Sequence, residues 1–369
     1  MREKHFLQRC LKLSRKIGWE SLAIVHRSDR ARVTTLHERT LTDIRGGEEF
    51  VRRYDGKAYI EPEHGYVITD GGLLIESALV PSYYPTNPWR HVMPCPFKFF
   101  RAKKTPGRVI HRPEVIHLRS LWEWNLWHFY ADVLGNLNLL EELGVDKNTP
   151  IVLGPYAGEL SFVKQILSSG ALAGREWIIP TDQYVCADRV YYVRQSQPYN
   201  KSLGYIVRQI GVPPPAADTD RRVFLYRPVT GSRHIINQVE VEALLARRGF
   251  RGVDASKMTI ADQIEMLSNT RYLFAVHGAG ITNIMYRMGR PLSLVELHPS
   301  NYMTESYMDM CRQMGFSYNT LPGAPEGGTA QNTNFTVDVG ALEAKIDAML
   351  AGDLEGRIEG PLVSRLPPT

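Results

Sequence analysis

Long apolar segments and cysteine are both scarce in this sequence. No apolar run reaches the roughly 18 residues that a membrane-spanning helix needs, and the N-terminus lacks the apolar core of a secretory signal peptide. The four cysteines lie far apart and form no CxxC pair, which argues against a zinc ribbon. Few and dispersed cysteines are typical of a reducing compartment, so we expect the protein in one.

The composition is that of a globular protein with more than one domain. Of the 369 residues, 43% are hydrophobic and 22% are charged, so each half can bury a core. The formal net charge of +5 fits a protein that handles acidic partners such as phosphates, nucleic acid or anionic lipid. Because the basic residues are not clustered with aromatic residues on one element, we expect no nucleic-acid partner.

Residues 1–24 are basic and mildly amphipathic. Apolar residues such as Phe6, Leu11 and Ile17 are interleaved with arginines and lysines. A helix of this kind suits peripheral contact with an anionic membrane, and it equally suits a solvated helix that packs on the domain. Both interpretations stay open.

The first half mixes short strands with a helical stretch. Residues 56–80 predict short strands with tight turns, among them a hairpin turn at Asp70-Gly71-Gly72, and the apolar residues 121–143 predict a helix. Further strands are expected at 151–153, 176–179 and 189–193, and one helix is expected near 158–168. This alternation predicts a βαβ-type domain, which the linker-like Pro213-Pro214-Pro215 ends.

The second half alternates more regularly. Strands are expected at 223–226, 252–253, 272–276 and 292–297. Helices are expected between them at 235–248, 259–267 and 281–288. Gly249 is the predicted C-cap of the first helix, and Thr259 with Asp262 is the predicted capping box of the second. The repeat predicts a parallel sheet, and two such halves predict a cleft where ligands meet the carboxyl ends of strands.

These patterns divide the chain into four parts. We expect a basic N-terminal segment, two α/β domains, and a tail with one helix. Their predicted bounds are 1–55, 56–215, 216–320 and 321–369.

A glycine-rich turn follows the strand predicted at 272–276. It runs from His277 to Asn283 as His277-Gly278-Ala279-Gly280-Ile281-Thr282-Asn283. The glycines allow close approach of a ligand, and the helix start attracts an anion. His277 can donate to a phosphate oxygen, and Thr282 or Asn283 can add hydrogen bonds. Spacing alone favours a phosphate site no more than a βα turn without a ligand.

Two arginines belong to the same predicted edge of the sheet. Arg227 follows the strand at 223–226, and Arg233 and Asn237 are four residues apart at the start of the next predicted helix. Guanidinium groups bind phosphate bidentately, so the pair suits a diphosphate. Each arginine alone is as well explained as a surface charge, but two motifs on one edge favour the phosphate site.

Three further residues are candidates for chemistry. His128 and Asp132 are at i,i+4, a spacing that allows an imidazole and a carboxylate to act as a base and its orienting partner. A core histidine is the alternative. Glu296 ends the strand at 292–297 and is a candidate acceptor for sugar or ribose hydroxyls, or else a strand-end surface charge.

Together these residues resemble glycosyltransferase family 61. The segment His277–Asn283, with Glu296 beyond it, is similar to the family's hallmark HGAGLTN segment. Arg227, Arg233 and Asn237 resemble the element that precedes the hallmark. Asn125-Leu126-Trp127-His128-Phe129 followed by Asp132 resembles the N-terminal element of the family. The resemblance covers roughly residues 56–320.

The resemblance implies a GT-B fold, with two Rossmann-like domains facing a central cleft. It implies an inverting transfer from a nucleotide sugar to a glycan or lipid-linked acceptor without a bound metal or other cofactor. In that fold, 56–215 is the acceptor side and 216–320 binds the donor. His128 and Asp132 are the expected catalytic residues. The expected donor-binding residues are Arg227, Arg233, Asn237, His277, Gly278, Ala279, Gly280, Thr282, Asn283 and Glu296.

Bacterial members of the family often act in capsule, lipopolysaccharide or exopolysaccharide assembly. Because no anchor is evident in the sequence, we expect a bacterial cytoplasmic enzyme, with residues 1–24 as the candidate contact with the inner membrane. Two alternatives stay open: another GT-B-like group transferase, of pyruvyl or phosphosugar, and a catalytically inactive sugar or nucleotide binder.

Overall fold

The structure, a computed structural model, describes most of the chain. The described residues are 32–41, 47–62, 65–69, 72–74, 107–120, 123–194, 200–214, 220–327 and 330–360. The amphipathic segment 1–24 and residues 70 and 71 of the predicted hairpin turn lie outside these ranges. None of the described helices is both long and apolar enough to cross a bilayer.

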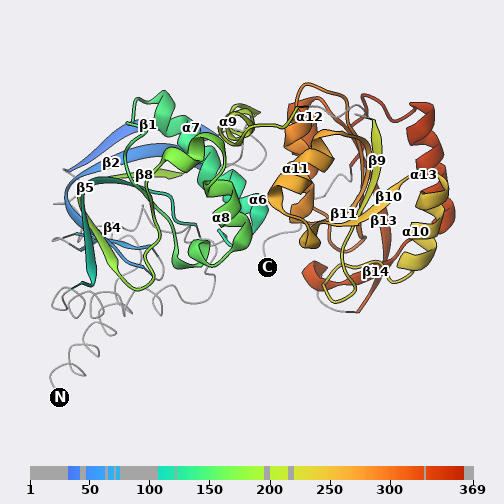
Figure 1. Cartoon of the computed structure of the whole chain (residues 1–369), viewed down its shortest axis with the longest axis horizontal. Coiled ribbons are helices and arrows are strands. Elements are labelled where there is room, and N and C mark those ends of the chain that lie inside the picture. The colour runs from blue at the N-terminus through green and yellow to red at the C-terminus, as the bar shows by residue number, and fades with distance from the viewer. Residues whose placement is uncertain are drawn as a thin grey trace, which may run out of the picture. The chain divides into compact units, whose positions relative to one another are not determined.

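The chain forms two compact units, each built on its own sheet (Figure 1). The first unit consists mainly of residues 1–124, 128–164 and 174–198, and the second contains 125–127, 165–173 and 199–369. The expectation of a mixed α/β protein with two sheets is therefore confirmed.

The first unit is only partly a βαβ domain. Its parallel part has the order β8-β5-β6-β7, with β5 at Val109–His117, β6 at Ile151–Val152, β7 at Trp177–Ile178 and β8 at Tyr184–Arg194. The antiparallel strands that extend it are β1 (Val33–Leu41), β2 (Gly47–Ile60), β3 (Val67–Thr69) and β4 (Gly72–Leu74). The expectation of a purely Rossmann-like first half is corrected on this point, because β2 pairs antiparallel with β8 along most of its length.

The stretch predicted as one helix at 121–143 is divided. It contains the short helix α6 (Leu126–His128), a π-helical segment at Phe129–Leu134 and α7 (Gly135–Glu142). The π-helical turn buries Phe129, Tyr130 and Val133 against the first unit. Helix α8 (Ser161–Leu167) matches the helix expected near 158–168, and α9 (Asn200–Ile210) precedes Pro213 and belongs to the second unit.

The second unit is a doubly wound parallel sheet. Its strands are β9 (Arg221–Tyr226), β10 (Arg251–Asp254), β11 (Thr270–Val276), β12 (Ser293–Pro299), β13 (Ser317–Glu326) and β14 (Asn334–Thr336). They have the order β10-β9-β11-β12-β13-β14, and only β14 is antiparallel to its neighbour. The predicted parallel sheet is confirmed.

Helices cover both faces of this sheet. Figure 1 shows α10 (Gln238–Arg247) and α13 (Val339–Ala351) on one face, and α11 (Ile260–Ser268) and α12 (Ser306–Met314) on the other. The predicted capping box of Thr259 and Asp262 starts α11. Gly249 follows α10 with a φ of 80°, as its predicted place after the helix requires. Apolar side chains of α10 and α13 pack with β9, β11 and β12 into one core, so α13 is part of this unit.

Candidate functional site

The strand order of the second unit marks where a ligand would bind. β9 has β10 on one side and β11 on the other, so the chain winds away from β9 in opposite directions. The crevice at such a reversal, outside the carboxyl ends of the strands, is the usual ligand site of a doubly wound sheet. Arg227 directly follows β9 and His277 directly follows β11. The two predicted motifs therefore meet at the reversal point.

Arg227 and Arg233 lack the partners that a buried arginine normally has. Both side chains are half-buried, and the Nε atom of each is buried without a hydrogen-bond partner in the part of the chain that the structure describes. Neither guanidinium forms an ion pair with a described carboxylate. Burial, and then repulsion from Arg233, lowers the pKa of Arg227. Two like charges held together without counterions form a site for an anion.

The backbone at Arg233 supports this interpretation. Arg233 has a φ of 62° and is the one residue other than glycine with a positive φ among the described residues. That conformation costs a side-chain-bearing residue roughly 1–2 kcal/mol. Strain of this kind is concentrated at functional sites. Arg233 also lies before α10, which begins at Gln238 rather than at Ile235, so the predicted helical face shared with Asn237 is wrong.

The glycine-rich turn fits around Arg227. A Cβ atom on Gly278 would lie 2.5 Å from Nη1 of Arg227, so a larger residue at this position would require the guanidinium to move. The turn continues into a 3-10 helix at Ala279–Arg287, close to the predicted helix at 281–288. The first amides of a helix have no partner within it. The Ala279 and Gly280 amides therefore add donors to the arginine pair.

His277 is held by a chain of two hydrogen bonds. Its Nδ1 lies 2.5 Å from Oε1 of Glu296, and the Tyr318 hydroxyl donates to Oε2 of Glu296 over 2.5 Å. The three residues come from three neighbouring strands of the sheet: His277 follows β11, Glu296 is in β12 and Tyr318 is in β13. Glu296 is 1% exposed, so its carboxylate is enclosed by these contacts. A hydroxyl of the donor is the partner that the sequence predicts for Glu296; the observed partners are His277 and Tyr318.

Aromatic rings enclose the imidazole. His277 packs edge-on against Tyr302 and Tyr307, with ring centroids 5.5 and 5.7 Å apart. Arg233 also contacts one of these two tyrosines: its Cζ lies 5.5 Å from the centroid of the Tyr302 ring. Trp127, the residue before His128, packs edge-on against Tyr307 at 5.3 Å. These contacts fix the rings around the imidazole and the Arg233 guanidinium.

Three other predicted donor ligands are engaged inside the protein. Asn237 bonds both the N–H and the C=O of Val337, and Asn283 donates to Gln263 over 2.9 Å. Thr282 donates to the Ala279 carbonyl over 2.6 Å. Their observed role is to hold the loops of the site, and their predicted contact with the donor stays a prediction.

The predicted catalytic base and its orienting carboxylate contact each other in the first unit. Nδ1 of His128 lies 2.7 Å from Oδ2 of Asp132, and both side chains are partly exposed. When Nδ1–H donates to the carboxylate, the lone pair of the neutral ring is on Nε2, the nitrogen that would accept a proton. The i,i+4 spacing thus brings the imidazole and the carboxylate into the hydrogen bond that the sequence predicts.

A second buried polar group lies at the ends of β5 and β6. Nε2 of His117 hydrogen-bonds the Gly65 carbonyl over 2.7 Å, and burial lowers the pKa of His117 to about 4. Arg119 donates to the Glu61 carbonyl, and Glu123 accepts the Gly154 amide over 3.1 Å. Burial raises the pKa of Glu123, and Arg119 partly opposes this. Every one of these side chains has a protein partner, so we assign them to the support of the strand ends.

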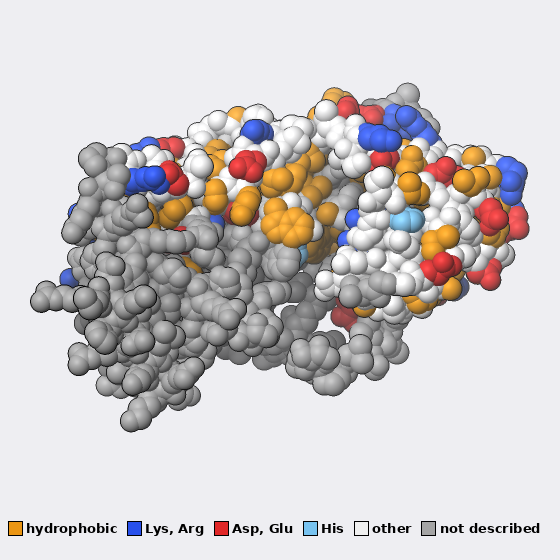
Figure 2. All heavy atoms as spheres, turned by 90° about the horizontal axis from the view of Figure 1, so that it is seen from below, with side chains coloured by type: hydrophobic (Ala, Val, Ile, Leu, Met, Phe, Trp, Pro, Cys, Tyr) orange, Lys and Arg blue, Asp and Glu red, His pale blue; other side chains and the backbone are white. Residues whose placement is uncertain are grey.

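Two general features of the described residues bear on other kinds of site. A cavity of about 680 Å³ runs along α11, but none of the predicted site residues lines it. Within the described ranges, no three His, Cys, Asp or Glu side chains gather in a way that could hold a metal ion. The face drawn in Figure 2 shows acidic and basic side chains interspersed over its described part.

The described chain is an α/β protein, and the carboxyl edge of its second sheet holds two half-buried arginines without a described carboxylate partner. The family model for glycosyltransferase 61 matches residues 126–295. The match confirms the resemblance of this region to glycosyltransferase family 61. No curated protein matches the chain.

The matched region contains the arginine pair, the glycine-rich turn and the pair His128–Asp132, and it ends one residue before Glu296. The similarity to this family supports glycosyltransferase activity, and the family implies a nucleotide-sugar donor and a glycan acceptor. Tyr307 and Tyr318 are residues of the site that the sequence motifs do not indicate. They lie on α12 and β13, and only the pairing of β12 with β13 brings Tyr318 to Glu296.

Proposed function

We propose that the protein is an inverting glycosyltransferase whose second unit binds the diphosphate of a nucleotide sugar. The observation that carries this proposal is the unpaired couple Arg227 and Arg233 at the reversal point of the sheet. A sugar diphosphate supplies the two negative charges that the couple lacks. The family implies such a donor.

The proposed reaction is a direct displacement. The acceptor hydroxyl loses its proton to Nε2 of His128, which Asp132 orients, and the oxygen attacks the anomeric carbon. The bond from that carbon to the phosphate oxygen breaks, and its electron pair leaves with the nucleoside diphosphate. Arg227, Arg233, His277 and the amides of the glycine-rich turn stabilise the new charge, each donor contributing about 3 kcal/mol.

The remaining parts of the proposal follow the family. We propose a GT-B arrangement, an acceptor that is a glycan or glycolipid, and a role in capsule, lipopolysaccharide or exopolysaccharide synthesis in the bacterial cytoplasm. Transfer is proposed to need no metal, since the arginines and His277 supply the positive charge. Activity that survives EDTA supports this part, and loss of activity that Mg²⁺ or Mn²⁺ restores contradicts it.

A thermal-shift screen against UDP, GDP, CMP and TDP tests the proposal. A ligand that binds the folded chain raises its unfolding temperature, so stabilisation by one nucleotide supports a nucleotide-sugar enzyme. No stabilisation by any of them favours another group transfer. Hydrolysis of the matching nucleotide sugar without acceptor then separates an enzyme from an inactive binder.

A further inference from the structure

Glu296 is a buried carboxylate in an unusual setting. Its oxygens accept from His277 and Tyr318 at 2.5 Å each, and no described lysine or arginine pairs with it. A buried carboxylate without a positive partner is strongly destabilising. An ionised Glu296 therefore needs a positive partner among the groups that touch or surround it.

The neighbours of Glu296 leave His277 as that partner. Burial, with a further contribution from Glu296, raises the pKa of Tyr318 and of Cys311, so both stay neutral. Burial raises the pKa of Tyr307 as well. His298 is the other histidine nearby, but burial lowers its pKa and its Nδ1 faces the Pro299 carbonyl. Of the two histidines, only His277 makes a direct bond to the carboxylate.

The other nitrogen of His277 is placed for a ligand. Nδ1 is used by Glu296, whereas Nε2 has no hydrogen-bond partner among the described residues. Edge-on contacts with Tyr302 and Tyr307 hold the ring in place. Arg233 lies against the same Tyr302 ring. The ring is thus fixed beside the guanidinium of the proposed phosphate site.

We propose that Tyr318 and Glu296 are positioning residues that hold His277 as a doubly protonated ring, with Nε2–H directed to the leaving diphosphate. A carboxylate on Nδ1 fixes the ring and stabilises the imidazolium, and Tyr318 fixes the carboxylate. Glu296 would then act through His277 and not bind the sugar itself. The inference rests on the proposed function for its ligand, but the charge state of His277 can be measured without any ligand.

The first experiment is NMR of the full chain with ¹⁵N-labelled histidine at neutral pH. The His277 resonance is assigned by its loss in His277→Gln. The ring is expected to show protons on both nitrogens, with a strongly downfield Nδ1 proton. In Glu296→Gln, which keeps the shape and an acceptor oxygen, one ring proton should be lost. A neutral His277 ring in the wild type overturns the proposal, as does an unchanged ring in Glu296→Gln.

The second experiment is calorimetric titration with inorganic pyrophosphate. Glu296→Gln should bind about tenfold more weakly, because a charge-assisted donor is lost, and Tyr318→Phe about threefold more weakly. Tyr272→Phe on β11 removes a phenol outside the chain of bonds and should bind like the wild type. Weakening of Glu296→Gln no greater than that of Tyr272→Phe overturns the proposal.

The two readouts keep this inference apart from the proposed function. A doubly protonated ring together with no binding of pyrophosphate by the wild type contradicts the diphosphate site, and with it the direction assigned to Nε2–H. The positioning of His277 by Glu296 still stands on the spectrum in that case. If Glu296→Gln does not fold, Tyr318→Phe carries the test, since it retains the carboxylate and removes one donor.

Discussion

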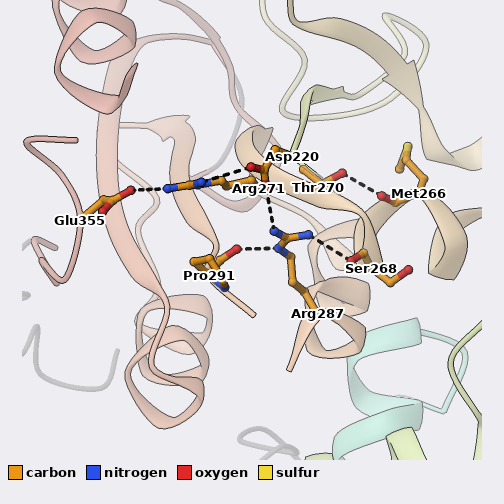
Figure 3. Close-up of polar contacts among 8 residues, drawn as sticks. All are labelled: Asp220, Met266, Ser268, Thr270, Arg271, Arg287, Pro291 and Glu355. Carbon is orange, nitrogen blue, oxygen red and sulfur yellow. Dashed lines mark hydrogen bonds and ion pairs between the residues drawn. The ribbon is translucent and has the colours of Figure 1, made fainter. Parts of the chain in front are cut away.

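Arginines at the two edges of the second sheet differ in whether they have carboxylate partners. At the amino edge, Arg271 lies between Glu355 and Asp220, and the buried Arg287 reaches Asp220 and the carbonyls of Pro291 and Ser268 (Figure 3). At the carboxyl edge, Arg227 and Arg233 have no carboxylate partner among the described residues. The same residue type is therefore structural at one edge and, by our account, a ligand group at the other.

The pKa shifts follow the same division. Hydrogen bonds to Glu355 and Asp220 raise the pKa of Arg271. Burial, and then repulsion from Arg290, lowers the pKa of Arg287 to about 10, and Asp220 partly opposes the change. Burial, and then repulsion from Arg233, also lowers the pKa of Arg227, but there no carboxylate opposes the change. The carboxyl edge thus keeps an unfavourable arrangement of charge that an anion would relieve.

The largest expected effect is on the reaction. Arg227→Ala and Arg233→Ala should each lower the transfer rate about 100- to 1,000-fold, because each removes a donor to the leaving diphosphate. Stability should not fall with activity. Arg233→Gly should even raise the free energy of unfolding by about 1 kcal/mol, since glycine accepts the positive φ. Transfer rates and urea unfolding of the three variants check this, and a large loss of stability would assign these arginines to the fold.

The amino edge should show the reverse behaviour. Arg287→Ala should lower the free energy of unfolding by about 3 kcal/mol, because two buried carbonyls and one carboxylate lose a donor. Its affinity for pyrophosphate, measured on the protein that remains folded, should be unchanged. Equal stability of Arg287→Ala and the wild type would remove the contrast between the edges.

His117 in the first unit is a buried histidine with a hydrogen-bond partner, so its protonation should affect stability. The pKa of His117 is about 4 in the folded chain and roughly 6.5 in the unfolded chain, so the unfolded state binds more protons between these values. Stability should therefore fall as the pH drops from 6.5 to 4, by about 3 kcal/mol in total. Unfolding of His117→Gln should show a smaller loss over this window. An equal loss in both proteins would place the acid sensitivity elsewhere.

A smaller effect on ligand binding is expected from a substitution in the glycine-rich turn. Gly278→Ala places a methyl group against Nη1 of Arg227, and the φ of 168° at Gly278 is one that alanine adopts without strain. The guanidinium must move, so pyrophosphate affinity should fall about tenfold with little change in stability. Gly231→Ala in the neighbouring loop meets only the Pro228 carbonyl at 3.4 Å and is the matched control. Unchanged affinity of Gly278→Ala would separate Arg227 from the site.

The fold of the second unit could be predicted from its sequence because each element is bounded by local signals. Thr259, Asp262 and Gly249 act within a few residues of their own positions, and the apolar runs at the strands are short and buried. The antiparallel strands of the first unit could not be predicted in the same way. The pairing of β2 with β8 joins segments more than a hundred residues apart, and no local pattern records it.

The site shows the same limit. Arg227 and His277 could be placed at one edge because each follows a strand of a parallel sheet. The role of Glu296 could not be predicted, since the sequence around a strand-end carboxylate does not show whether it faces solvent or a buried histidine. Its partners were decided by the pairing of β12 with β11 and β13. The register places Ala275 and Thr320 opposite Glu296, and His277 and Tyr318 reach it from two positions away along these two sides.

The most direct test compares one arginine from each edge. Pyrophosphate is titrated at low salt into the wild type, Arg233→Ala and Arg271→Ala, which lose the same charge from opposite ends of one sheet. Our account predicts that Arg271→Ala binds like the wild type and that Arg233→Ala binds at least about tenfold more weakly. Equal affinities of all three proteins, or equal losses in both variants, would contradict it.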